Sequence, residues 1–208
     1  MRTYVETHYE GMNDEDLLKA IIRERAGSGI AEEILAERSL KDLMLDTTLH
    51  ELIQVDGIGK AKVEQLLAMK EIMKRLMTAA SKSISKISSP ADAFQYVRVD
   101  LMGLRKEQFM ILLLDTKNQI IKSVVVSIGT LNASLVHPRE VFRPAIKEAA
   151  SSILLVHNHP SGHTAPSKED LVITKRLYEA GLLIGIPVID HVIVTDNDYY
   201  SFKENGEI

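Results

Sequence analysis

The 208-residue sequence contains no cysteine. This absence excludes disulfide bonds and thiolate metal sites, so any bound metal ion must be held by His, Asp or Glu side chains. There is also no apolar run of about 18 residues or more, so no membrane-spanning helix is expected. The acidic N-terminus lacks the apolar core of a secretory signal, which predicts a cytoplasmic protein.

Neither sign of charge is in large excess. The 25 Lys and Arg residues and the 29 Asp and Glu residues give a formal net charge of -4. This balance provides no global attraction to nucleic acid, so any such binding would have to come from a local patch. Apolar residues make up 45% of the chain and charged residues 26%, which is typical of a globular protein.

Hydrophobic periodicity divides the chain into two parts. Up to residue 80 the pattern is helical, with a first helix that is expected to end at Gly27 to Gly29. We therefore predict a small all-helical domain over residues 1–80. Residues 81–89 are small and polar, which predicts a linker, although the segment SISKIS within them is also consistent with a short edge strand. Residues 90–208 mix helices and strands, which predicts an α+β layer architecture.

The elements of the second part can be placed from capping and turn signals. Helices are expected to begin near Pro90, Pro138 and Ser167. Two β-rich runs flank the turn DTKNQ and predict a hairpin. The apolar run SSILLVHNHP predicts a buried strand that ends at two histidines, and PVIDHVIVTDNDYYSF predicts one more strand, a turn and a final short strand.

The segment HNHPSGHTAPSKED, residues 157–170, carries the strongest chemical signal. His157 and His159 are two residues apart on a predicted strand, so their side chains share a face. Asp170 lies in the first turn of the next helix, and a strand-turn-helix path can return its carboxylate to the imidazoles. Two neutral imidazoles and a carboxylate suit zinc and leave a fourth position for water. A structural pair of histidines beside a turn explains the same spacing, so both interpretations stand on spacing alone.

The same segment resembles a known signature. His157, His159, Pro160, Ser167 and Asp170 match the fixed positions of the JAMM metalloproteases, also called MPN-plus or JAB. The segments HNHPSG, PSKED, IDHVIV and YYSF, with DGIG upstream, resemble more closely the RadC branch of that family. The resemblance covers nearly the whole chain, although the N-terminal helical part is short for the family. It implies a helix-hairpin-helix domain followed by a JAMM domain with a cytidine-deaminase-like, three-layer fold.

The resemblance also implies roles for individual residues. It makes His157, His159 and Asp170 the ligands of a Zn²⁺ ion. Ser167 takes the position of a serine that hydrogen-bonds near the metal and helps to stabilise the oxyanion.

The general acid/base has two candidates. The catalytic Glu of the family lies at the beginning of a core strand, and KEQFMILLLD puts Glu107 at that position, so Glu107 is the favoured residue. Glu140 in HPREVF is the competitor. It stands next to a helix N-terminus, where a capping or dipole role is the ordinary explanation.

Neighbouring polar residues have supporting roles at most. Asn158 is expected to point away from the two histidines and to satisfy backbone groups. Asp190 and His191, at the start of a predicted core strand, either orient a metal ligand or are simply buried.

A second motif lies in the helical part. VDGIGKAK, residues 55–62, follows the apolar-x-Gly-apolar-Gly pattern and resembles the helix-hairpin-helix motif, which binds the DNA backbone without reading bases. Gly57 and Gly59 permit a tight turn whose N–H groups can hold a phosphate, and Lys60 and Lys62 add positive charge. A turn that only packs two helices explains the same pattern.

Two functions from different classes follow. The first is a zinc-dependent hydrolase of JAMM metallopeptidase type that cleaves an amide or isopeptide bond in a peptide substrate. The second is a DNA-binding protein associated with repair or recombination, whose C-terminal domain acts as a metal-dependent nuclease. An inert scaffold is disfavoured because every metal and acid position of the signature is filled.

Overall fold

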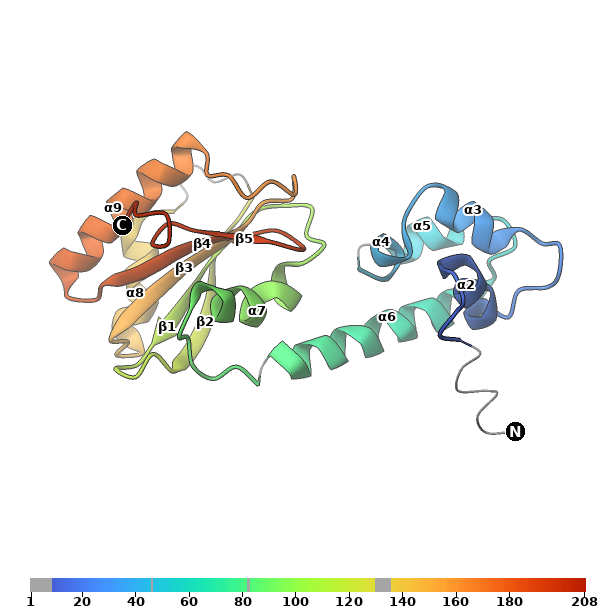
Figure 1. Cartoon of the computed structure of the whole chain (residues 1–208), viewed down its shortest axis with the longest axis horizontal. Coiled ribbons are helices and arrows are strands. Elements are labelled where there is room, and N and C mark those ends of the chain that lie inside the picture. Colours follow the sequence, from blue (N-terminus) through green and yellow to red (C-terminus); the bar gives the residue numbers. More distant parts are fainter. Residues whose placement is uncertain (1–8, 46, 82, 130–135) are drawn as a thin grey trace. The chain divides into compact units, whose positions relative to one another are not determined.

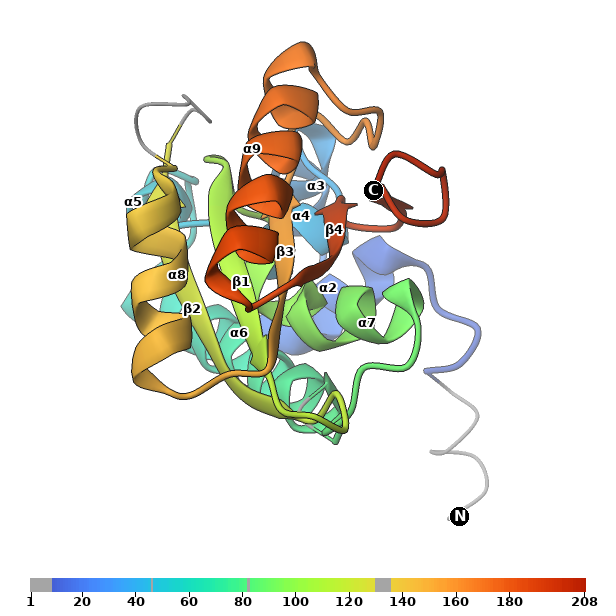
Figure 2. The same ribbon diagram turned by 90° about the vertical axis from the view of Figure 1, so that its left-hand side faces the viewer.

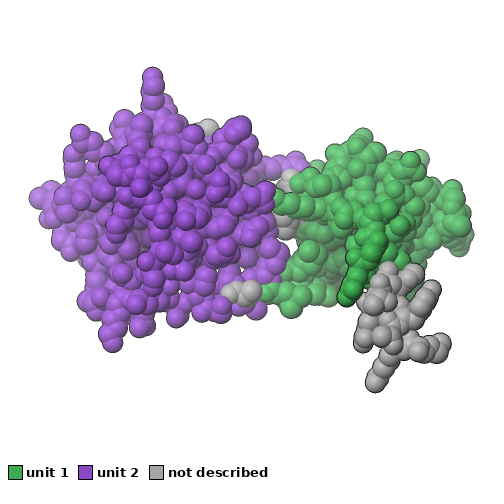
Figure 3. All heavy atoms as spheres, viewed as in Figure 1, with its two compact units in different colours: residues 1–76 green, residues 77–208 purple. Residues whose placement is uncertain are grey.

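The computed structural model describes residues 9–45, 47–81, 83–129 and 136–208. The chain forms two compact units, Met1–Leu76 and Met77–Ile208 (Figure 3). Among the described residues, no helix combines the length and the apolar character needed to cross a membrane.

The first unit is built only from helices in its described part (Figure 1). They are α2 (Asp14–Ile22), α3 (Ile30–Ala36), α4 (Leu40–Leu45), α5 (Leu49–Ile53) and α6 (Lys60–Ser81), whose last turn belongs to the second unit. Apolar side chains from all five helices form one buried core: Leu18, Ile22, Ile30, Ala31, Ile34, Leu43, Met44, Leu52, Ile58, Val63 and Leu66. This burial stabilises the short helices, which would be marginal in isolation.

Helix α2 ends earlier than the sequence predicts. It stops at Ile22, where Arg23 adopts a left-handed conformation with φ 49°, and the glycines at 27 and 29 lie in the following loop. Glu24 explains the early end, because its carboxylate accepts hydrogen bonds from the first N–H groups of α3: Ile30 N at 2.7 Å and Ala31 N at 3.0 Å. The N-cap residue of α3 is a glycine, which has no side chain for this role.

The Glu24 cap yields a prediction for stability. Burial opposes its ionisation, but the hydrogen bonds from Ser28, Ala31 and Ile30 outweigh burial and lower the pKa of Glu24 from its usual value. A depressed folded-state pKa means that the stabilisation is present above the unfolded pKa and is lost as the pH falls through the folded one. We expect Glu24→Ala to lower the free energy of unfolding by about 1 kcal/mol at pH 7, and by less at pH 3.

Chemical denaturation followed by far-UV circular dichroism measures this effect at both pH values. Glu24→Gln, which keeps an acceptor oxygen but has no charge, is the control and should show no such pH dependence. Equal destabilisation by Glu24→Ala at pH 7 and pH 3 would contradict the charged-cap explanation.

The second unit is a sheet with helices on both faces, which confirms the expected α+β class. Its strands are β1 (Gln108–Leu114), β2 (Ile120–Ile128), β3 (Ser152–Asn158), β4 (Val188–Val194) and β5 (Tyr199–Ser201), in the order β2-β1-β3-β4-β5. Only β3 and β4 run parallel; the other neighbours are antiparallel. The expected hairpin around DTKNQ is present as β1 and β2.

The helices cover the sheet in two layers (Figure 2). Helix α7 (Pro90–Leu101) packs on one face, and α8 (Pro138–Lys147) with α9 (Lys168–Ile184) packs on the other. Upstream of α7, Lys86 forms a β-bridge with Gln119, so the SISKIS segment pairs with the turn between β1 and β2.

Strand β3 determines which side of the sheet His157 faces. All seven of its residues are buried, and their side chains alternate between the two cores. Ile153 and Leu155 pack on the α8–α9 side, and Leu154 and Val156 on the α7 side. By this alternation His157 faces the side of α9.

Gly181 allows α9 to lie close to the start of β4. A Cβ atom at this position would stand 2.7 Å from the carbonyl oxygen of Ile186, 3.2 Å from the nitrogen of Val188 and 3.3 Å from the Phe142 ring. Two of these neighbours are backbone atoms, which can move away only if the main chain is distorted. The close approach of α9 to the sheet therefore depends on glycine here.

We expect Gly181→Ala to destabilise the second unit. The gain in helix propensity is about 1 kcal/mol, whereas the overpacking costs about 1–3 kcal/mol, so the net change in the free energy of unfolding should be unfavourable. Urea denaturation followed by circular dichroism measures it. Leu183→Ala, on the same helix with a side chain that is 90% exposed, is the near-neutral control, and a Gly181→Ala variant as stable as this control would refute the packing argument.

Candidate metal centre

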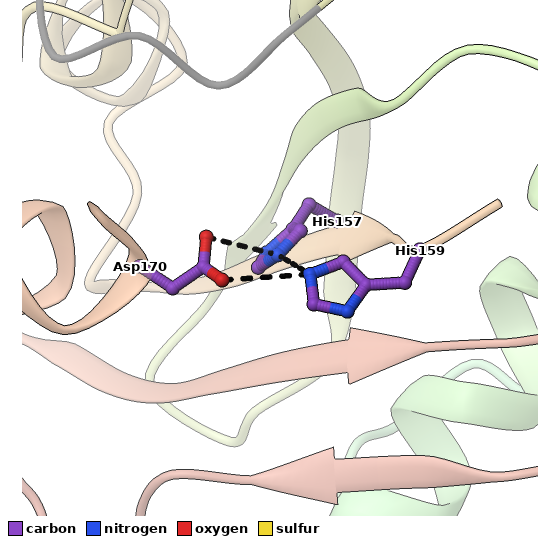
Figure 4. Close-up of side chains that lie close together, drawn as sticks. All are labelled: His157, His159 and Asp170. Carbon is purple, nitrogen blue, oxygen red and sulfur yellow. Dashed lines mark hydrogen bonds and ion pairs between the residues drawn. The ribbon is translucent and has the colours of Figure 1, made fainter. Parts of the chain in front are cut away.

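Three side chains from two elements converge at the end of β3 (Figure 4). His157 lies in β3, His159 follows the strand, and Asp170 lies in the first turn of α9. The Nε2 atoms of the two histidines are 3.0 Å apart. Asp170 places Oδ1 3.3 Å from His157 Nε2 and Oδ2 3.4 Å from His159 Nε2. Among the described residues, these three form a group that could hold a metal ion.

The three separations suit ligands of a single ion. Ligand atoms at zinc-like distances of about 2.0–2.1 Å in a tetrahedron lie about 3.3–3.4 Å from one another. The observed separations are close to that value: the two Nε2 atoms are 3.0 Å apart, and each lies 3.3 or 3.4 Å from a different oxygen of Asp170. Because His157 and Asp170 are buried and His159 is only half-buried, the side next to His159 is where a further ligand can enter.

The site favours the ionised state of Asp170. Burial alone would raise its pKa, but the contacts with His157, His159 and Ser167 lower the pKa of Asp170 well below its usual range. Burial lowers the pKa of His157 and so favours its neutral form, with Asp170 opposing part of that effect. An ionised carboxylate and a neutral imidazole are the states that metal binding requires.

His159 differs from His157 in its surroundings. Its Nδ1 is 2.7 Å from the carbonyl oxygen of His163, and a carbonyl only accepts, so Nδ1 carries a proton and donates. The hydrogen bond with Asp170 raises the pKa of His159. His159 therefore directs its Nε2 atom at the carboxylate.

Ser167 is the N-cap of α9 and holds Asp170 directly. Its backbone N–H and its hydroxyl donate to Asp170 Oδ2 at 2.7 and 2.6 Å, and its Oγ accepts from the Asp170 N–H at 3.1 Å. This capping box explains why a Ser-x-x-Asp spacing serves both the helix start and the site. In this arrangement the hydroxyl proton points at the carboxylate.

The site opens into a cleft of about 380 Å³. Glu107, His159, Ser167 and Asp170 are among the residues that line it. Glu140 is not among the described residues that line this cleft; its carboxylate lies 3.1 Å from Arg139 at the start of α8. The two candidates for the general acid/base thus differ in position, and only Glu107 borders the cleft shared with the three converging side chains.

Asn158 holds the segment that carries Glu107. Its side-chain oxygen accepts from the Gln108 N–H at 2.7 Å, and its amide nitrogen donates to the Lys106 carbonyl at 3.2 Å. The carbonyl of Glu107 itself accepts from the Gly129 N–H at 2.8 Å. The expectation that Asn158 satisfies backbone groups is confirmed, and those groups are the two that flank Glu107.

Removing this clamp should loosen β1 at its start. We expect Asn158→Ala to lower the free energy of unfolding by about 1 kcal/mol, because two hydrogen bonds between the buried Asn158 side chain and the backbone are lost. Amide exchange at Gln108 should accelerate more than at Leu112 of the same strand, which serves as the internal control. Metal content should stay unchanged, because Asn158 points away from the two histidines. Unaltered exchange at Gln108 would show that the clamp does not restrain this segment.

The four residues of the predicted DNA-binding turn, Gly57, Gly59, Lys60 and Lys62, lie between α5 and the first turn of α6. Gly57 has φ +78°, and a Cβ there would lie 2.9 Å from the side chain of Ile30, so both conformation and packing require glycine. Gly59 has open space around it. Lys60 is 90% exposed and stands 3.8 Å from Glu64, whereas Lys62 donates to the Gly57 carbonyl at 3.2 Å.

Sequence reasoning missed Thr174. It lies one helical turn after Asp170 on α9 and is buried, and its Oγ1 is 2.5 Å from Nδ1 of His191. Its spacing of four residues from Asp170 was the available signal, because residues i and i+4 share a helix face.

Comparison with known proteins identifies relatives over nearly the whole chain. Residues 87–207, more than half of the sequence, match a family model described as RadC-like JAB domain. A UPF0758 protein of Methanosarcina mazei is 44% identical over 201 residues, which are 95% of this chain and 87% of that protein. A UPF0758 protein of Bacillus cereus is 42% identical over 198 residues, covering 95% of this chain and 84% of the relative.

Proposed function

Because the chain belongs to the family of RadC-like JAB domains, we propose that it is a zinc-dependent hydrolase of JAMM metallopeptidase type. Its proposed reaction is the hydrolysis of an amide or isopeptide bond in a peptide substrate. One observation carries this proposal: two imidazoles and a carboxylate converge within 3.4 Å, and Glu107 lines the same cleft. JAB domains are generally metal-dependent hydrolases, which agrees with this arrangement.

His157, His159 and Asp170 are the proposed zinc ligands. They fit the ion in type as well as in spacing, because zinc accepts imidazole nitrogen and carboxylate oxygen. The bound ion would polarise the substrate carbonyl and make water a nucleophile at neutral pH.

The remaining steps belong to the protein. Glu107 accepts the proton of the attacking water and delivers it to the leaving nitrogen, so that one proton moves from water to amine as the C–N bond breaks. Asn158 keeps the backbone around Glu107 in position through its two hydrogen bonds. Ser167 fixes Asp170, and it also lies on the cleft, where a rotated hydroxyl can donate to a developing oxyanion.

Metal content tests the ligand assignment. We expect the wild-type chain to bind one zinc ion, and His157→Ala and Asp170→Asn to lose stoichiometric binding, because each removes one of three ligands. Elemental analysis of protein purified with added zinc measures this. Glu140→Gln, at a carboxylate outside the cleft, is the matched control and should keep its zinc. Full zinc content in His157→Ala would exclude the assigned site.

Activity tests the general acid/base. On a panel of peptides and isopeptides, Glu107→Gln should keep its zinc and lower kcat by about 100- to 10,000-fold, which is the usual contribution of a positioned proton carrier. Glu140→Gln should retain activity. The opposite pattern would transfer the role to Glu140, and a zinc-loaded wild type that cleaves no member of the panel would contradict the peptidase proposal.

We propose a second function for the first unit, which is contact with the DNA backbone through a helix-hairpin-helix turn. The supporting observation is that Gly57 takes a left-handed conformation in the turn that leads into α6 and that Lys60, the first residue of this helix, is 90% exposed. N–H groups and cations at such a turn attract phosphate. This unit would deliver the hydrolase domain to DNA in repair or recombination; a nuclease activity of the second unit is the alternative that DNA substrates would reveal.

The glycines supply a sharp test of DNA contact. Gly59→Leu adds bulk where the surroundings are open, so the fold should persist while phosphate approach is blocked. We expect weaker binding of the full-length chain to branched DNA in gel-shift assays, with strong weakening from low to high salt for the wild type. Lys60→Gln should reduce the salt dependence. Unchanged DNA binding in Gly59→Leu would remove the turn from the interface.

A further inference from the structure

His191 forms the buried wall behind the candidate metal centre. It lies in β4 and is fully buried, as are His157 and Thr174. Its ring stacks on Phe202, with centroids 4.7 Å apart and planes 13° apart, and meets the edge of Phe109 at 5.6 Å. The two aromatic rings restrict the orientation of the imidazole, so its two nitrogens point in defined directions.

Both nitrogens of His191 have partners. Nε2 lies 2.8 Å from His157 Nδ1, and Nδ1 lies 2.5 Å from Thr174 Oγ1. Thr174 Oγ1 in turn lies 2.5 Å from the carbonyl oxygen of Asp170. The chain of contacts therefore starts at the backbone of Asp170 and passes through Thr174, His191 and His157, whose Nε2 faces the carboxylate of the same Asp170.

The donor and the acceptor of each hydrogen bond in this series can be assigned by starting at the Asp170 carbonyl. A carbonyl oxygen only accepts, so the Thr174 hydroxyl donates to Asp170 and has no second proton to give. Thr174 Oγ1 must then accept from His191, which places a proton on His191 Nδ1. His191 is fully buried against the rings of Phe109 and Phe202, and its two nitrogens contact His157 and Thr174 and no carboxylate. A charged imidazole would be unpaired there, so His191 is neutral and its Nε2 accepts. His157 must therefore donate from Nδ1.

We propose that Thr174 and His191 are positioning residues that fix the tautomer of His157, so that a metal ion finds its Nε2 lone pair available. The inference rests on the proposed zinc site and deepens it. With the other tautomer, Nε2 would carry a proton and could not bind the ion. The tautomers of the two histidines thus depend on different groups. The loop carbonyl of His163 fixes the tautomer of His159, whereas the hydrogen bonds through Thr174 and His191, which begin at the Asp170 carbonyl of α9, fix the tautomer of His157.

This order explains the arrangement of the three converging groups. With protons on both Nδ1 atoms, two imidazole lone pairs and an ionised carboxylate all point to one place. Such a concentration of electron pairs is unfavourable unless a cation neutralises it. The buried hydrogen bonds therefore give the centre the protonation states that favour cation binding before any cation binds.

A simple packing role for Thr174 makes a different prediction, and one pair of variants separates the two. Thr174→Val keeps the shape and removes the hydroxyl. Thr174→Ser keeps the hydroxyl and removes a methyl group. If the hydroxyl fixes the hydrogen-bond directions, Thr174→Val should weaken zinc binding more than Thr174→Ser. If Thr174 only fills space, Thr174→Ser should have the larger effect.

Zinc affinity of the full-length chain is the first measurement, by competition with a chromophoric chelator. We expect Thr174→Val to bind zinc about 10- to 100-fold more weakly, the usual effect of losing an outer partner of a ligating histidine. Thr174→Ser should bind close to wild type. Equal affinities for Val and wild type, or a larger loss for Ser than for Val, would overturn the proposal.

The tautomers can also be observed directly in the metal-free wild type, which needs no variant to fold. Long-range ¹H–¹⁵N correlation spectra distinguish the two tautomers of each imidazole. We expect His191 and His157 both to carry their proton on Nδ1, and a proton on Nε2 of either would overturn the proposal. A wild type that has these tautomers and binds no zinc would instead contradict the proposed function, so the two failures are distinguishable.

Discussion

The second unit depends on how a buried carboxylate is compensated. Asp170 is 1% exposed, and an isolated charge at such a place would cost several kcal/mol. The first turn of α9 supplies part of the compensation, through the N–H and hydroxyl of Ser167 and the positive end of the helix. The two imidazoles lie 3.3 and 3.4 Å away, and in the proposed tautomers a cation between them and the carboxylate would complete the compensation. The geometry of the polar centre therefore depends on the helix start.

The polar centre also depends on how close α9 lies to the sheet. The carboxylate reaches His157 only if the helix packs tightly on β3 and β4, and Gly181, three turns along α9, allows the close approach. Apolar contacts carry the same packing, since Ile173 and Leu177 of α9 share a core with Leu155 of β3. The apolar burial provides the free energy that holds the charged groups together.

Much of this could be predicted from the sequence. The alternation of β3, the Ser-x-x-Asp helix start and the His-x-His spacing are local signals with short range, and they correctly brought His157, His159 and Asp170 to one place. The hairpin of β1 and β2 and the helices at Pro90 and Pro138 followed from turn and capping residues. These features depend on residues that are neighbours in the chain.

The rest depends on contacts between distant residues, which one sequence does not display. The partnership of Thr174 with His191 requires the parallel register that sets His191 beside Leu155. The glycine at 57 is required by Ile30, which lies 27 positions earlier. The early end of α2 follows from the hydrogen bond between the Glu24 side chain and Ile30, six residues later. Helix propensity does not predict this contact. In each case tertiary structure decided between locally acceptable alternatives.

The pairing of β1 with β3 has a consequence for how such a protein can change. Phe109 pairs with His157, and the neighbouring Asn158 binds the backbone on both sides of Glu107. The spacing between Glu107 and the histidines is thus set by the pairing of β1 with β3. The loop from Ser161 to Ala165 borders the cleft and carries none of the three converging groups. The loop holds His159 through a backbone group, the carbonyl of His163, which every side chain leaves in place. Mutation of the loop side chains can therefore change the lining of the cleft while the three converging groups keep their positions.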